Sequence, residues 1–150
     1  MEIFRILTLS SAGMSAQRAR MSVTSANLAN TETTRTPEGG PYRRRDVMFQ
    51  ALPLRGPAGG LVQAGGPAGA GTILTVEVAG VRESQRPFKR IYDPGHPDAG
   101  LDGYVSYPDI NTMEELVDLM AAVRSYEANL ATFNATKTLI RRLLELGQAR

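Results

Sequence analysis

The stretch MEELVDLMAAVRSYEANLATFNATKTLIRRLLEL, residues 113–146, decides the fold class of this 150-residue chain. Its apolar residues fall mostly three, four or seven positions apart, and no glycine or proline interrupts them before Gly147. Such spacing predicts one long helix with a narrow apolar stripe, which is a seam for another helix rather than the broad face of a core helix. The stripe consists of Met113, Leu116, Met120, Val123, Leu130, Phe133, Ile140 and Leu144.

A second seam lies at the other end of the chain, where an apolar residue recurs every seven positions: Leu7, Met14, Met21 and Leu28. We predict helices over residues 3–29 and 112–146. Asn111 with Glu114 forms a capping box at the start of the second helix, and Asn30 suits the end of the first because asparagine tolerates the left-handed conformation. Helices of about 40 and about 50 Å must bury much of their apolar surface against each other or against other copies.

The middle of the chain has a different pattern. Short runs with β-forming residues predict strands at 42–49, 73–79, 88–92 and 103–107, and Leu74, Val76 and Val78 are expected to share one face. Residues 55–71 contain seven glycines and two prolines, so we interpret them as a flexible loop and assign them no role. The expected fold class is α+β, with a small, mostly antiparallel β unit between the two helices.

These boundaries predict three regions. Residues 1–32 form an N-terminal coiled-coil helix, residues 33–110 form a β-rich centre that includes the glycine-rich stretch, and residues 111–150 form a C-terminal coiled-coil helix.

The composition offers little material for chemistry. The chain has no cysteine and one histidine, which disfavours zinc, iron–sulfur and thiol sites, and a net charge of +2 does not by itself indicate nucleic acid. Metal or acid–base chemistry can be considered only at Asp93, His96, Asp98 and Asp102. Their spacing lacks the calcium-loop pattern, and prolines and glycines favour a rigid turn there. We therefore predict no catalytic, metal-binding or cofactor-binding residues.

Several polar residues allow two interpretations. Asn27, Asn30, Asn129 and Asn134 lie on or near the seams, where asparagine either fixes the helix register when buried or caps the helix and faces solvent. Arg43–Arg45 is the densest basic run, but a phosphate or nucleic-acid patch needs aromatic partners and only Tyr42 adjoins it. We favour a solvated or interface strand. The seam methionines either fill a core or let one seam pack against slightly different neighbours.

The N-terminal sequence MEIFRILTLSSAG, residues 1–13, has a short apolar run and an acidic second residue, so it does not predict a secretory signal. No segment has the run of about 18 apolar residues that a membrane span needs. We expect a chain that does not span a membrane and that, outside the cytoplasm, would need export without a cleaved signal peptide.

Four segments carry a resemblance to a known family. SANLANT, residues 25–31, resembles the S-x-N-[IL]-A-N signature of flagellar rod and hook proteins, so Asn27, Ala29 and Asn30 are its motif residues. GGPYRRRDVMF at 39–49, PFKRIYDPGHPDA at 87–99 and GYVSYPDIN at 103–111 are similar, in the same order, to proteins of the proximal rod. The resemblance covers nearly the whole chain apart from residues 55–71.

The resemblance implies a structural protein without catalytic activity, cofactor, small-molecule substrate or nucleic acid. It implies terminal helices that pair as an antiparallel coiled coil, and helical assembly with other copies and related rod proteins into the basal-body rod of the periplasm. It also implies export by the flagellar type III apparatus without a cleaved signal peptide. The alternative is a coiled-coil adaptor that forms a small closed oligomer, and an enzyme built on the Asp93–Asp102 turn is the least favoured class.

Overall fold

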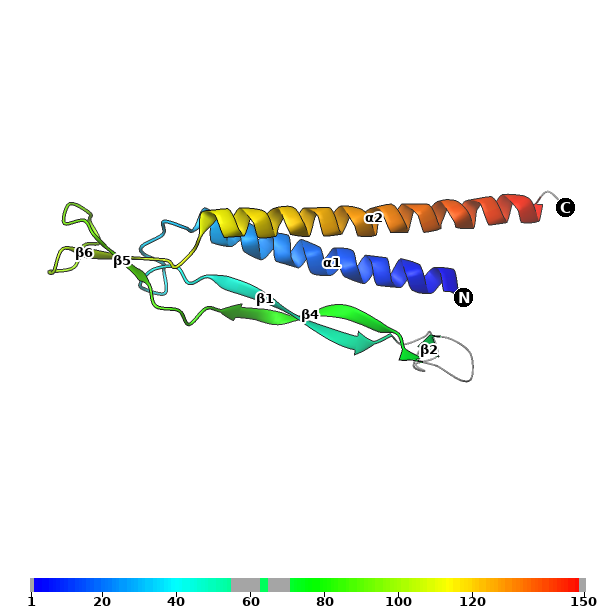
Figure 1. Cartoon of the computed structure of the whole chain (residues 1–150), viewed down its shortest axis with the longest axis horizontal. Helices are drawn as coiled ribbons and strands as arrows, with labels where there is room; N and C mark the ends of the chain where they lie inside the picture. The colour runs from blue at the N-terminus through cyan, green and yellow to red at the C-terminus, as the bar shows by residue number, and fades with distance from the viewer. Residues whose placement is uncertain (1, 55–62, 65–70, 149–150) are drawn as a thin grey trace. The chain divides into compact units, whose positions relative to one another are not determined.

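The computed structural model describes residues 2–54, 63–64 and 71–148. The chain divides into two compact units: Met1–Arg18, Phe49–Ala79 and Val123–Arg150 form the first, and Ala19–Met48 and Gly80–Ala122 form the second. Two long helices, α1 (Glu2–Ala29) and α2 (Thr112–Gln148), contribute to both units. They pack against each other and run in opposite directions, as the coloured ribbons of Figure 1 show. The two predicted helices and the α+β class are confirmed.

The helix ends are set by asparagine side chains. Asn111 Oδ1 accepts a hydrogen bond from the backbone N–H of Met113 at 3.1 Å, which confirms it as the N-cap of α2. The Glu114 side chain makes no hydrogen bond within the described residues, so the second half of the predicted capping box is not formed there. At the end of α1, Asn30 Nδ2 donates to the carbonyl of Ala26 at 2.8 Å.

The expected left-handed conformation at Asn30 is wrong, because none of the described non-glycine residues has a positive φ. The side-chain amide of Asn30 gives a second hydrogen bond to the Ala26 carbonyl, which also accepts from the Asn30 backbone N–H at 3.2 Å. The helix therefore closes without a backbone reversal at this residue.

The strands form three separate antiparallel pairs rather than one sheet (Figure 1). They are β1 (Arg45–Pro53) with β4 (Leu74–Glu83), β2 (Gln63–Ala64) with β3 (Gly71–Thr72), and β5 (Lys89–Tyr92) with β6 (Tyr104–Tyr107). Most of the predicted loop, residues 55–62 and 65–70, lies outside the described residues. Its described residues, 63–64 and 71, belong to the short strands β2 and β3. A two-stranded pair is marginal in water by itself, so these strands depend on the helices for support.

The buried apolar residues of the first unit are Ala16 on α1 and Leu54 directly after β1, which are 3% and 7% exposed. Leu74 is 55% exposed, and the groove along α1 is lined by the next four residues of β4. The two helices contact each other at Gly13, where an added Cβ would lie 2.9 Å from Asn129 Nδ2. A larger residue there would require the Asn129 side chain to move.

In the second unit, Val105, Ile110 and Ala122 form the apolar core, with 1%, 4% and 0% exposure. The β5–β6 pair runs from Lys89 opposite Tyr107 to Tyr92 opposite Tyr104. Gly103 ends the connecting turn with a φ of +76°, and a Cβ there would lie 2.7 Å from the Tyr92 ring. Only glycine fits both the conformation and the space at this position.

Much apolar surface stays exposed. Among the described residues, six apolar residues are buried, whereas nineteen large apolar side chains are exposed, ten of them on α2. Within that same part of the chain, no helix combines the length and apolarity that crossing a bilayer requires. Exposed apolar side chains and charged side chains thus lie on the same helix, α2.

Candidate functional site

The second unit contains a buried polar network centred on Asn27, a residue of the SANLANT motif that is 1% exposed. Asn27 Nδ2 donates to the carbonyl of Arg45 at 2.8 Å and to Glu115 Oε2 at 3.1 Å. Asn27 Oδ1 accepts from the backbone N–H of Arg45 at 2.9 Å and from the Tyr42 hydroxyl at 3.1 Å. The amide thus uses both donors and both acceptor positions, and one residue joins α1, the entry to β1 and the first turn of α2.

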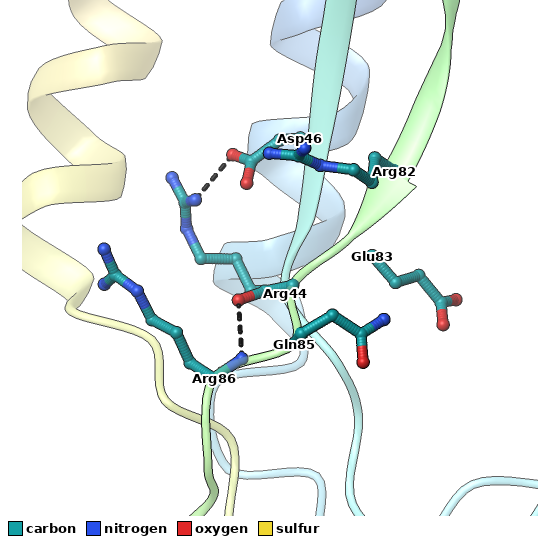
Figure 2. Close-up of a pocket in the computed structure, with 7 residues that line it drawn as sticks. Arg44, Asp46, Arg82, Glu83, Gln85 and Arg86 are labelled. Carbon is teal, nitrogen blue, oxygen red and sulfur yellow. Dashed lines mark hydrogen bonds and ion pairs between the residues drawn. The ribbon is translucent and has the colours of Figure 1, made fainter.

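Glu115 is the charged centre of this network and is 2% exposed. Its Oε1 accepts from Arg44 Nε at 2.6 Å, and Arg44 Nη1 lies 2.5 Å from Asp46 Oδ1 (Figure 2). Burial of the Arg44 guanidinium acts against its charge, but the hydrogen bond and charge of Glu115, with further help from Asp46, raise the pKa of Arg44 above its ordinary value. The buried carboxylate therefore has a permanent cationic partner.

The neighbouring residues of the basic run are engaged within the same unit. Arg45 Nη2 lies 3.1 Å from Glu83 Oε1, and its guanidinium lies 5.6 Å from the centre of the Tyr42 ring. Arg43 Nη1 donates to the carbonyl of Ser84 at 3.2 Å and packs over the Phe88 ring. Burial raises the pKa of the Tyr42 hydroxyl. The run therefore contributes intramolecular contacts, and Phe88 is an aromatic partner that the local sequence does not reveal.

The four asparagines have different roles. Asn27 is buried and fixes the register between α1 and α2, whereas Asn30 caps α1. Asn129 is half-buried against Gly13, and its Nδ2 donates to the carbonyl of Ser125 at 2.9 Å. Asn134 is exposed. Both interpretations offered by the sequence are therefore found, each at different residues.

The predicted assembly seam divides into two groups by exposure. Leu7, Met14, Met21 and Leu28 on α1, with Phe133 and Ile140 on α2, are half-buried within the chain. The other six residues are exposed, with fractions from 37% to 69%: Met113, Leu116, Met120, Val123, Leu130 and Leu144. These six side chains are available to another molecule, and their role as an assembly seam stays a prediction.

The face of α2 that turns toward α1 was predicted only in part, since Phe133 and Ile140 are its only residues in the predicted seam. Its buried and half-buried residues alternate at spacings of four and three: Glu115, Leu119, Ala122, Tyr126, Asn129, Phe133, Thr136 and Ile140. This is a continuous helix-packing register. A search for apolar residues overlooks it because half of its members are polar, charged or small, although the alternating spacing itself is visible in the sequence.

The acidic residues of the turn between β5 and β6 make hydrogen bonds and an ion pair within the second unit. Asp93 Oδ1 accepts from the Gly95 N–H at 3.2 Å, and Asp98 Oδ2 accepts from the Thr34 hydroxyl at 2.8 Å. His96 Nδ1 accepts from the Asp98 N–H, and Asp102 pairs with Arg90. These contacts are those of a structural turn.

Two family models of flagellar basal-body rod proteins match this chain, one at each end. The family model "Flagella basal body rod protein" matches residues 6–35, which include Asn27, Ala29 and Asn30, and the model "Flagellar basal body rod FlgEFG protein C-terminal" matches residues 101–146. The chain is 39% identical over 153 residues to the flagellar basal-body rod protein FlgC of Bacillus subtilis (strain 168), covering 99% of this chain and 100% of the relative.

Two further relatives share that name. The protein of Aquifex aeolicus (strain VF5) is 40% identical over 146 residues, covering 97% of both chains. The protein of Salmonella typhimurium (strain LT2) is 36% identical over 148 residues, covering 99% of this chain and 100% of the relative.

Proposed function

This chain belongs to the FlgC family of flagellar basal-body rod proteins, and from that premise we propose that it is a structural subunit of the proximal rod. In this proposal it polymerises helically through its terminal helices and transmits torque for motility. It acts in the periplasmic space after export by the flagellar type III apparatus, without a cleaved signal peptide. It works without catalysis, cofactor, small-molecule substrate or nucleic acid.

The exposed apolar stripe of α2 is the observation that carries the proposal. Met120 and Leu130 are 55% and 38% exposed, while α1 already contacts other residues of the same helix, including Glu115 and Asn129. A helix with apolar residues on two faces has a second packing surface, and exposed apolar patches of this kind mark sites of protein association. We propose that other copies and related rod proteins cover this stripe.

A repeated contact between two different surfaces gives an open helical polymer rather than a closed ring, which is the geometry a rod needs. Stiffness under torque then comes from many packed contacts along the helices. The Asn27 network supports this role because it holds α1, β1 and α2 together inside one subunit. Load received by one helix is passed to the others through satisfied, buried hydrogen bonds.

The test is an in-frame deletion of the gene in the source bacterium, scored for swimming and by electron microscopy of purified basal bodies. The proposal predicts non-swimming cells with membrane rings but no complete rod, and rescue by the intact gene. Normal rods and normal swimming would contradict it. A small closed oligomer of the purified chain at micromolar concentration, found by sedimentation, would instead favour the coiled-coil adaptor.

A further inference from the structure

An open pocket of about 460 Å³ lies in the second unit. Its lining comes from the entry to β1 and from the end of β4 with the residues that follow: Arg44, Asp46, Arg82, Glu83, Ser84, Gln85 and Arg86. Figure 2 shows Arg44, Arg82 and Arg86 extending to one side of the strands, whereas Glu83 and Gln85 extend to the other side. The alternation of side chains along an extended chain explains this arrangement.

Most charges at this pocket are already paired. Arg44 is held by Glu115 and Asp46, and Glu83 is held by Arg45. Two exposed arginines have less compensation. The Arg82 side chain makes no hydrogen bond or ion pair within the described residues, and Arg86, which is 72% exposed, has a single long ion pair with Asp109 at 3.9 Å.

We infer that Arg82 and Arg86 receive a side-chain carboxylate from an acidic segment of a neighbouring rod subunit. The guanidinium group presents a planar fork of donors that matches a carboxylate with two hydrogen bonds. This inference rests on the proposed function, because it requires a neighbouring subunit.

The mixed charge of the pocket explains the choice of partner. Asp46 lies in the lining and would repel a strongly charged phosphate or a polyanion. A side-chain carboxylate carries a single negative charge, so it brings less repulsion to Asp46 than a phosphate or a polyanion does. The pocket therefore fits a folded protein surface better than nucleic acid or an anionic polymer of the cell wall.

The first experiment reverses both charges with Arg82→Glu and Arg86→Glu in the full chain, expressed in the deletion strain. We expect at least a tenfold loss of the chain from purified basal bodies relative to another rod component. Arg82→Lys with Arg86→Lys keeps the charges and should retain more than half of the incorporation. Arg35→Glu is the matched control, because Arg35 is an 81% exposed arginine of the same unit outside the pocket.

The fold of the charge-reversed chain is checked by circular dichroism. Arg82→Glu alone serves as a second variant, since Arg82 has no partner to lose. Unchanged incorporation of both charge-reversed variants would overturn the inference.

The second experiment places a photo-crosslinking amino acid at Ser84, which lies between the two arginines in the lining. We expect crosslinks in wild-type basal bodies to a rod subunit, within a few residues of an Asp or Glu, and their loss in the charge-reversed background. Crosslinks only to peptidoglycan, or none from a chain that is present in the rod, would overturn the inference. If the chain is absent from basal bodies altogether, the proposed function fails instead, so the two failures are distinguishable.

Discussion

Asn27 Nδ2 lies 3.1 Å from Glu115 Oε2, although 88 positions separate the two residues in the sequence. The bond joins the last turns of α1 to the first turn of α2, and both side chains are almost completely buried. Asn27 also pairs with both backbone groups of Arg45. The relationship therefore fixes which part of each helix faces the other and where β1 begins.

Asn27→Ala should lower the free energy of unfolding by about 2–4 kcal/mol, because it leaves the Arg45 backbone N–H without its buried partner and removes a donor from Glu115. Urea unfolding of the full chain, followed by circular dichroism, measures the change. Ser22→Ala is a matched control, since Ser22 is exposed on the same helix. Equal stabilities of the Asn27 variant and the wild type would contradict the network's role.

Tyr42→Phe should cost about 1 kcal/mol near neutral pH by removing the hydrogen bond to Asn27 Oδ1. Burial raises the pKa of Tyr42, so the folded chain keeps the phenol proton to a higher pH than the unfolded chain. The stability from the neutral phenol is complete below about pH 10 and is lost as the pH rises through the folded pKa.

The difference between wild type and Tyr42→Phe should therefore shrink above about pH 10. Urea unfolding of both chains at a series of pH values tests this. A difference that stays constant into the alkaline range would show that the buried hydroxyl does not titrate differently in the two states.

Gly13→Leu should destabilise the first unit by about 1–3 kcal/mol, because even a Cβ would lie 2.9 Å from Asn129 Nδ2. Adding Asn129→Ala should recover a large part of the loss, since it removes the side chain that the leucine meets. A double-mutant cycle of thermal unfolding measures the coupling. Additive effects of the two substitutions would contradict a direct contact between these positions.

Leu130→Asp or Met120→Lys should abolish incorporation into the rod while leaving the central strands folded, because each places a charge on the exposed stripe. Ala128→Asp is the matched control for Leu130→Asp, since it adds the same negative charge at an exposed position of α2 outside the stripe. Swimming and the amount of the chain in purified basal bodies are the readouts. Normal swimming with either stripe variant would refute the seam assignment.

The helices were predictable because their periodicity and the N-cap at Asn111 are local signals. The strands β1, β4, β5 and β6 were located to within a few residues by β-forming runs, whereas β2 and β3 overlap the stretch interpreted as a loop. The grouping of the strands into three pairs was not predicted. Which strand meets which depends on contacts distant in sequence, such as the bond from Leu54 N–H to the Ile73 carbonyl.

The site was only partly predictable. The SANLANT resemblance selected Asn27, but its partners Tyr42 and Glu115 carry no local sign of burial. Glu115 occupies a helix position where a charged residue normally faces solvent, and its burial is possible because Arg44 and Asn27 satisfy its two oxygens. Only Phe133 and Ile140 of the α2 face that contacts α1 were predicted, because half of the residues on that face are polar, charged or small.

We propose that neighbouring subunits cover the exposed stripe of α2 in the rod. Electron cryomicroscopy of basal bodies purified from the source bacterium tests this most directly. We expect density for this chain in the rod, with the Met120 and Leu130 side chains buried against another subunit. Density for the chain in which both side chains face solvent would contradict it.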